Sequence, residues 1–172
     1  MPEHDSLERM QRMYPDRFFD EGTLPASAAR AVVSAAELAL AGGVPVLALP
    51  SAFLLRACDR ILTLVCRKSL HVVLTVRQTE LTGGAEEDPP GIFDLSMLSV
   101  LPGMTVMAPK NRWELEDMLG YAVNEHDGPI ALCCPRGEVF EGFEEMRSPI
   151  RPGRSEILYD ENGIALIAVG SN

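Results

Sequence analysis

Short apolar runs alternate along this chain with longer stretches of helical character. Four runs have strand length and cover residues 44–49, 71–76, 104–108 and 129–134. Nearly every position in them is apolar, as expected for strands of a parallel sheet that is covered on both faces. A shorter strand candidate lies at residues 17–20.

The stretches between these runs predict helices. An alanine-rich segment at 26–41 is followed by Gly42-Gly43, a C-cap signal. Apolar side chains recur at helical spacing in 52–67 and 111–125, where Ser51 and Asn111 are the expected N-caps. A first helix is expected from Asp5 or Ser6 to Tyr14. A short helix should also precede Pro102-Gly103, with an apolar face formed by Phe93, Leu95, Met97, Leu98 and Leu101.

Strands that alternate with helices at this spacing predict an α/β fold, a three-layer sandwich with a mainly parallel sheet. Ligands of such sheets bind outside the carboxyl ends of the strands. The loops expected there are 50–51, 77–90, 109–110 and 135–137.

The pattern changes near the end of the chain. Residues 138–154 are charged and rich in Pro and Gly, which indicates a linker. Two further strands are expected at 157–159 and 164–169, the second without the helix that would complete a parallel crossover. We therefore expect a fragment of a longer protein or one part of a split protein, with domains at 1–137 and 155–172 joined by 138–154.

Charge and composition exclude several classes of function. The 172 residues have a formal net charge of −10, which argues against a nucleic-acid partner. No apolar run is long enough for a membrane span, and no signal peptide is recognisable, so a cytoplasmic location is expected. The four cysteines, Cys58, Cys66, Cys133 and Cys134, lack zinc-site spacing; they are expected to be reduced and buried, with a reactive thiol as the alternative. No metal site and no catalytic role is assigned to the histidines His4, His71 and His126.

Six motifs together resemble one known family. They are YPDRFFD (14–20), SAFLLRACD (51–59), GIFDLSML (91–98), PGMTVMAPK (102–110), DGPIALCCPRG (127–137) and IALIAVGSN (164–172). Their order and spacing resemble the pyrimidine-binding domain of 1-deoxy-D-xylulose-5-phosphate synthase, a transketolase-like enzyme that depends on thiamine diphosphate. The last motif resembles the first strand of that family's C-terminal domain.

The resemblance implies a cofactor held between two domains. A separate diphosphate-binding domain or subunit would hold thiamine diphosphate through magnesium, and the domain resembled here would receive the aminopyrimidine ring. A glutamate of this domain activates the ring in the family, which transfers two carbons from pyruvate to glyceraldehyde 3-phosphate. Because this chain contains no Gly-Asp-Gly…Asn motif, it is not expected to bind the cofactor and magnesium alone.

Three residues correspond to site positions of the family. Phe53 has the position of the aromatic residue that stacks on the cofactor ring, or is a core residue of its helix. Arg56 and Arg136 have the positions of arginines near the substrate phosphate, or are surface residues.

Other family positions have changed. The activating glutamate is replaced by Pro25 or Ala29, depending on the direction of counting, and the nearest carboxylate is Glu21. The substrate loop begins Arg77-Gln78 where the family has Asp-Arg, has Pro89 at the histidine position and contains the acidic run 86–88. No catalytic residue is therefore assigned. A bound cation at 86–88 is the alternative to a solvated acidic loop, and Ser27 and Ser51 have no base partner for a nucleophilic role.

Two hypotheses remain open. The chain is either the pyrimidine-binding half of an active synthase, acting as a homodimer or hetero-oligomer, or a non-catalytic homologue kept for assembly or regulation. A flavodoxin-like or Rossmann-like binding module is a third alternative, although no Gly-x-Gly-x-x-Gly loop is present.

Overall fold

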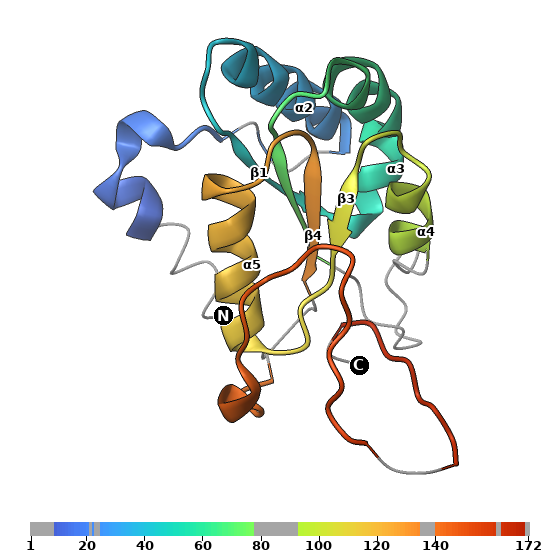
Figure 1. Cartoon of the computed structure of the whole chain (residues 1–172). Helices are drawn as coiled ribbons and strands as arrows, with labels where there is room; N and C mark the ends of the chain where they lie inside the picture. The colour runs from blue at the N-terminus through green and yellow to red at the C-terminus, as the bar shows by residue number, and fades with distance from the viewer. Residues whose placement is uncertain are drawn as a thin grey trace, which may run out of the picture.

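A parallel sheet forms the centre of the molecule (Figure 1). The computed structural model describes residues 9–20, 22, 25–77, 93–134, 140–160 and 163–170. The four described strands are β1 (Val46–Pro50), β2 (Val73–Arg77), β3 (Thr105–Met107) and β4 (Ile130–Cys134). They are hydrogen-bonded in the order β1-β2-β4-β3, and all three pairs are parallel. The four apolar runs therefore form the predicted strands.

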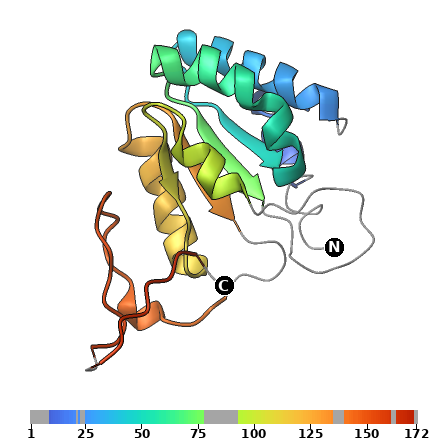
Figure 2. The ribbon, with the colours of Figure 1, turned by 90° about the vertical axis from the view of Figure 1, so that its right-hand side faces the viewer.

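Helices cover both faces of this sheet, so the fold has the expected three layers (Figure 2). Alternate residues of the central strand β4 separate the two cores: Ala131 and Cys133 face one, and Ile130 and Leu132 face the other. The larger core contains the buried side chains of α2 (Pro25–Leu40), α3 (Ser51–Arg60) and α4 (Asp94–Ser99). The second core lies under α5 (Arg112–Asn124).

The ends of these helices follow the expected chemistry at several points. Gly42 has φ +87, and the N–H groups of Gly42 and Gly43 donate to carbonyls of the last turn of α2. This left-handed residue ends the helix as the Gly-Gly signal predicted. At the start of α5, the Asn111 side chain accepts a hydrogen bond from Glu114 N at 2.8 Å, which confirms the predicted N-cap.

The helical run predicted at residues 52–67 is confirmed, but it is less regular than the sequence indicates, and α3 itself is Ser51–Arg60. The run continues through a π-helical turn, Ile61–Val65, and a 3-10 turn, Cys66–Lys68. Ser69 then ends the helical run in the left-handed conformation, with φ 50. The predicted N-cap Ser51 is wrong, because Pro50 occupies the cap position and Ser51 is the first helical residue.

Three predicted strands are absent from the described structure. The strand predicted at residues 17–20 is wrong, since Pro15–Arg17 is a 3-10 turn and residues 18–20 have no regular structure. Residues 157–159 and the described residues of 164–169 also form no strand, and most of their apolar side chains are exposed. Phe93, expected on the apolar face of the short helix, is 67% exposed, whereas Leu98 and Leu101 are buried.

The segment 140–156 follows the surface of the molecule beside α5. The carbonyl oxygens of Phe140 and Gly142 accept hydrogen bonds from Arg112 N (2.9 Å) and Asn111 Nδ2 (2.8 Å). Ile150 packs against the core under α5. A segment expected to be a linker is thus attached to the helix; we name residues 140–156 the docked segment.

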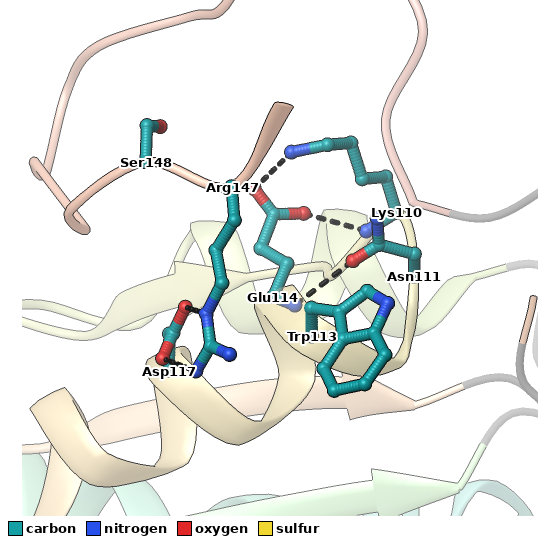
Figure 3. A pocket seen from close by; sticks show the side chains of 7 residues that line it. All are labelled: Lys110, Asn111, Trp113, Glu114, Asp117, Arg147 and Ser148. Carbon is teal, nitrogen blue, oxygen red and sulfur yellow. Dashed lines mark hydrogen bonds and ion pairs between the residues drawn. The ribbon is translucent and has the colours of Figure 1, made fainter. Parts of the chain in front are cut away.

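Charged side chains complete this attachment (Figure 3). Arg147 donates two hydrogen bonds to the Asp117 carboxylate, from Nε at 2.6 Å and from Nη2 at 2.5 Å. Lys110 Nζ bonds Glu114 at 3.1 Å and Glu156 at 2.5 Å. Burial acts to lower the pKa of the Lys110 ammonium, but its hydrogen bonds to these two carboxylates outweigh burial and raise it. Two of these pairs, Arg147 with Asp117 and Lys110 with Glu156, join residues that are far apart in the sequence.

Candidate functional site

Helix α3 begins immediately after β1, at the carboxyl edge of the sheet. Leu54 and Ala57 are fully buried against the larger core, while Arg56 is exposed. Phe53 is half-buried and packs against that core. Phe53 and Arg56 are three residues apart and therefore lie on neighbouring positions of the helix surface. The structure thus places both predicted residues near the edge where ligands of parallel sheets bind.

A buried carboxyl lies at the same edge. Asp94, the first residue of α4, is 5% exposed and accepts a hydrogen bond from the Ser51 side chain. Its Oδ2 atom is buried with no hydrogen-bond partner in the described structure. Burial raises the pKa of the Asp94 carboxyl, and the bond from Ser51 opposes this increase. Sequence reasoning missed this pair, because no local motif links residues 51 and 94.

The buried thiol of Cys133 lies close enough to Asp94 for the carboxylate charge to affect the pKa of the thiol. Cys133, the penultimate residue of β4, is 2% exposed. Burial, followed by the charges of Asp94 and Cys134, raises the pKa of the Cys133 thiol to about 12. The thiol is therefore protonated at neutral pH and is a poor nucleophile.

The remaining cysteines are consistent with this state. All four are free thiols: Cys66 is buried like Cys133, whereas Cys58 and Cys134 are half-buried. Burial raises the pKa of Cys66 to about 11 and that of Cys134 in the same direction. The prediction of reduced cysteines therefore fits, although two of the four are not fully buried.

The two candidate positions of the activating glutamate both lie in α2. Pro25 is the first residue of this helix and Ala29 is half-buried in its second turn. Neither residue has an ionisable side chain. Ser27, between them, is buried and donates a hydrogen bond to Gly22 O at 2.7 Å. The first two turns of α2, residues 25–32, therefore supply no carboxyl for the activation of a cofactor ring, and no proton transfer is assigned to this position.

Several predicted residues lie outside the described part of the chain. These are Arg136, Glu21, Gln78, Pro89 and the acidic run 86–88. Arg77, the last residue of β2, is described and exposed. The structure thus brings Phe53 and Arg56 to one edge, and it leaves the position of Arg136 a prediction.

The described ranges contain neither a cluster of metal ligands nor a membrane-spanning helix. No group of three or more His, Cys, Asp or Glu residues there could hold a metal ion. No described helix has both the length and the apolar character needed to cross a bilayer.

Two cavities lie beside α5, away from Phe53 and Arg56. One of about 390 Å³ opens between α5 and the docked segment, lined by Asp117, Tyr121, Glu125, Arg147, Ser148, Pro149 and Ile150. The smaller pocket of Figure 3 adjoins it, around Trp113. Neither is lined by Phe53 or Arg56, so neither is the predicted cofactor site.

An all-parallel sheet between helical layers, with an aromatic and an arginine after β1 at its carboxyl edge, fits an α/β module of the thiamine diphosphate-binding class. The family described as "Transketolase, pyrimidine binding domain" matches residues 26–141. This is more than half of the chain, and the chain belongs to that family.

Curated relatives agree with this assignment. A 1-deoxy-D-xylulose-5-phosphate synthase of Lachnoclostridium phytofermentans is 44% identical over 171 residues, covering 99% of this chain and 27% of the relative. A second, from Geobacter sulfurreducens, is 42% identical over 172 residues, with coverages of 99% and 26%. The resemblance to the pyrimidine-binding domain of this synthase is confirmed. The chain spans about a quarter of the length of these relatives.

A solved structure shows the same fold. It is described as a split-gene transketolase, inactive beta4 tetramer, and aligns with a TM-score of 0.71 at 27% identity. The alignment covers 84% of this chain and 45% of that chain.

Proposed function

We propose that this chain is the pyrimidine-binding part of a two-carbon transferase of the 1-deoxy-D-xylulose-5-phosphate synthase type. In this proposal the chain receives the aminopyrimidine ring of thiamine diphosphate, and a separate diphosphate-binding unit holds the diphosphate and magnesium. Pyruvate and glyceraldehyde 3-phosphate would be the substrates of the assembled protein, in the synthesis of isoprenoid and thiamine precursors. The assembly would act in the cytoplasm.

The arrangement of Phe53 and Arg56 on α3 is the observation that supports this proposal most strongly. Phe53 presents part of an aromatic ring at the edge of the sheet, where a flat heterocycle can stack. The exposed Arg56 guanidinium, one turn further along, is suited to a phosphate group. Arg136 would contribute a second guanidinium from the turn that follows β4.

The chain is proposed to need a partner for cofactor binding. In the proposal its described residues form one side of the ring pocket. These residues include no group of three or more His, Cys, Asp or Glu side chains that could hold a metal ion, and no carboxyl at the activating position in α2. The split-gene transketolase relative is a tetramer of one type of chain and is described as inactive. By analogy, this chain alone would assemble as a homodimer or larger oligomer and would become competent only with a diphosphate-binding subunit.

The domain organisation is part of the same proposal. Residues 1–137 would form the pyrimidine-binding domain, and 155–172 would be the start of a transketolase C-terminal domain joined by 138–154. In the structure the joining segment lies against α5. Its ion pairs would therefore fix the direction in which the chain leaves the domain.

Calorimetric titration of thiamine diphosphate with Mg²⁺ tests the proposal. The sample is this chain mixed with the diphosphate-binding domain of the Lachnoclostridium phytofermentans synthase, expressed as a separate chain. We expect micromolar binding to the mixture and none to this chain alone. Phe53→Leu should weaken binding about tenfold, since ring stacking typically contributes on the order of 1 kcal/mol. Phe93→Leu, at an exposed aromatic, is the matched control.

A non-catalytic homologue is the second candidate function. The absence of an ionisable side chain at both Pro25 and Ala29 favours it. In that case the mixture would assemble, as judged by sedimentation, but would bind no cofactor and consume no pyruvate. Tight binding of thiamine diphosphate and magnesium by this chain alone would contradict both candidates.

A further inference from the structure

The first turn of α3 has no side-chain cap. The first N–H groups of any helix have no acceptor within the helix, and a side chain at the N-cap commonly supplies one. In α3 the N-cap is Pro50, which has no such acceptor, and no cap hydrogen bond forms. The first turn contains no acidic residue either. An interaction with another element can therefore add to the stability of this turn.

Asp94 provides that interaction from a different helix. Ser51, the first residue of α3, is 3% exposed and donates a side-chain hydrogen bond to the Asp94 carboxyl. Asp94 itself begins α4 and is equally buried. A carboxyl near the N-terminus of α3 also interacts favourably with the partial positive charge of that helix end. The pair thus joins two helices at the carboxyl edge of the sheet.

We propose that Asp94 is a positioning residue that holds Ser51 and thereby fixes the first turn of α3. Phe53 lies on this turn, and Arg56 lies on the next one. The importance of this for cofactor binding rests on the proposed function, whereas the positioning itself does not. Asp94 does not touch the cofactor in this proposal. It acts on the ring pocket only through the backbone of α3.

The arrangement of the two Asp94 oxygens supports a local role. The Asp94 carboxyl accepts a hydrogen bond from Ser51, while its Oδ2 atom is buried and has no hydrogen-bond partner among the described residues. A buried acceptor without a partner is costly, so this carboxyl is not optimal for stability alone. Removal of the side chain should therefore loosen the start of α3 more than it destabilises the whole fold.

Amide hydrogen exchange of the intact chain, followed by mass spectrometry, tests the positioning without any ligand. In an α-helix the N–H groups of residues 55–57 bond the carbonyls of residues 51–53, so their exchange reports on the first turn. Asp94→Ala and Ser51→Ala should each accelerate this exchange roughly tenfold or more, the effect of losing a hydrogen bond to a charged group. Exchange in α2 and β2 should change less than twofold.

Three further variants sharpen the test. Asp94→Asn retains an acceptor for Ser51 and should restore slow exchange in the first turn. The Ser51→Ala, Asp94→Ala double variant should exchange no faster than either single variant, because both changes remove the same bond. Asp59→Asn, at an exposed carboxylate of α3, is the matched control and should behave as the wild type.

Two results would overturn the inference. One is unchanged exchange at residues 55–57 in Asp94→Ala; the other is equal acceleration in α2, α3 and α5, which would mean a general loss of stability. A calorimetric experiment with the diphosphate-binding partner then tests the consequence: Asp94→Ala should raise the Kd of thiamine diphosphate about tenfold, and Asp59→Asn should not. Failure of the wild type to bind would refute the proposed function, while the exchange data would still decide the positioning.

Discussion

Asn111 joins α5 to the docked segment, and its replacement should show how much this contact contributes to stability. The side chain is 2% exposed and makes two hydrogen bonds at once. Its Oδ1 accepts from Glu114 N at 2.8 Å, and its Nδ2 donates to Gly142 O, also at 2.8 Å. The first bond caps the helix, and the second holds the docked segment. Asn111→Ala removes both.

The expected cost can be added from the two bonds. Loss of an N-cap costs about 1 kcal/mol. Loss of the bond to Gly142 costs roughly another 1 kcal/mol, since Gly142 is only half-buried and water can reach its carbonyl. The free energy of unfolding should therefore fall by about 2 kcal/mol, which corresponds to a shift of roughly 1 M in the urea midpoint at a typical slope.

Urea unfolding followed by circular dichroism measures this change, and two variants separate its parts. Asn111→Asp keeps a good N-cap acceptor but cannot donate to Gly142 O, so it should lose about half as much stability as Asn111→Ala. Asn124→Ala, at an exposed residue of the same helix, is the matched control and should stay within about 0.5 kcal/mol of the wild type. A wild-type midpoint for Asn111→Ala would refute the reasoning, and a wild-type midpoint for Asn111→Asp would show that the docked segment adds no stability.

Three further predictions concern titration, fluorescence and thiol reactivity. Burial, together with the positive charge of His71, lowers the pKa of His126 below its usual 6.5. The stability associated with neutral His126 should therefore be lost as pH falls below about 6.5. In urea titrations from pH 8 to 5, His126→Gln should flatten this part of the stability profile. The Arg147 guanidinium lies 5.7 Å from the ring centre of Trp113, the single tryptophan, so Arg147→Ala should shift the fluorescence emission. Arg147→Lys lacks the planar fork that binds Asp117 and should not fully restore the wild-type emission. Iodoacetamide should modify Cys133 at pH 8 only as fast as the protein opens, because the thiol is buried and burial raises its pKa to about 12. Peptide mass spectrometry measures the labelling, and rapid labelling in the folded state would contradict this prediction.

Much of the fold could be predicted from local patterns. The four strands are nearly continuous apolar runs because both faces of the sheet are covered, and this signature needs no long-range information. The cap at Asn111 and the end of α2 at Gly42 were predictable for the same reason, since each depends on residues within one turn.

Features that depend on distant residues could not be predicted in this way. The docked segment is attached by pairs such as Arg147 with Asp117 and Lys110 with Glu156, which are 30 and 46 residues apart. Composition alone indicated a linker. Similarly, Ser51 is a favoured N-cap residue by type, and only the structure shows that it is the first helical residue and bonds Asp94 instead of capping α3.

The candidate site was predictable only in part. The positions of Phe53 and Arg56 came from motif resemblance, and the structure places both at the carboxyl edge of the sheet. Their roles stay predictions, as does the role of Arg136. Asp94 lay within a recognised motif, but its burial and its partner are properties of the folded chain.

Strand β1 has a consequence for handling this protein in solution. It is one edge of the described sheet, and its α5-side face is open, with Val46 51% exposed and Ala48 also accessible. Between Val46 and Leu49 it contains no lysine, no proline and no bulge that would discourage another strand from pairing with it. Such an edge is a template for edge-to-edge aggregation, which the net charge of −10 opposes by mutual repulsion. High salt or a pH near 4.7 removes that repulsion, so concentrated samples should precipitate first under those conditions.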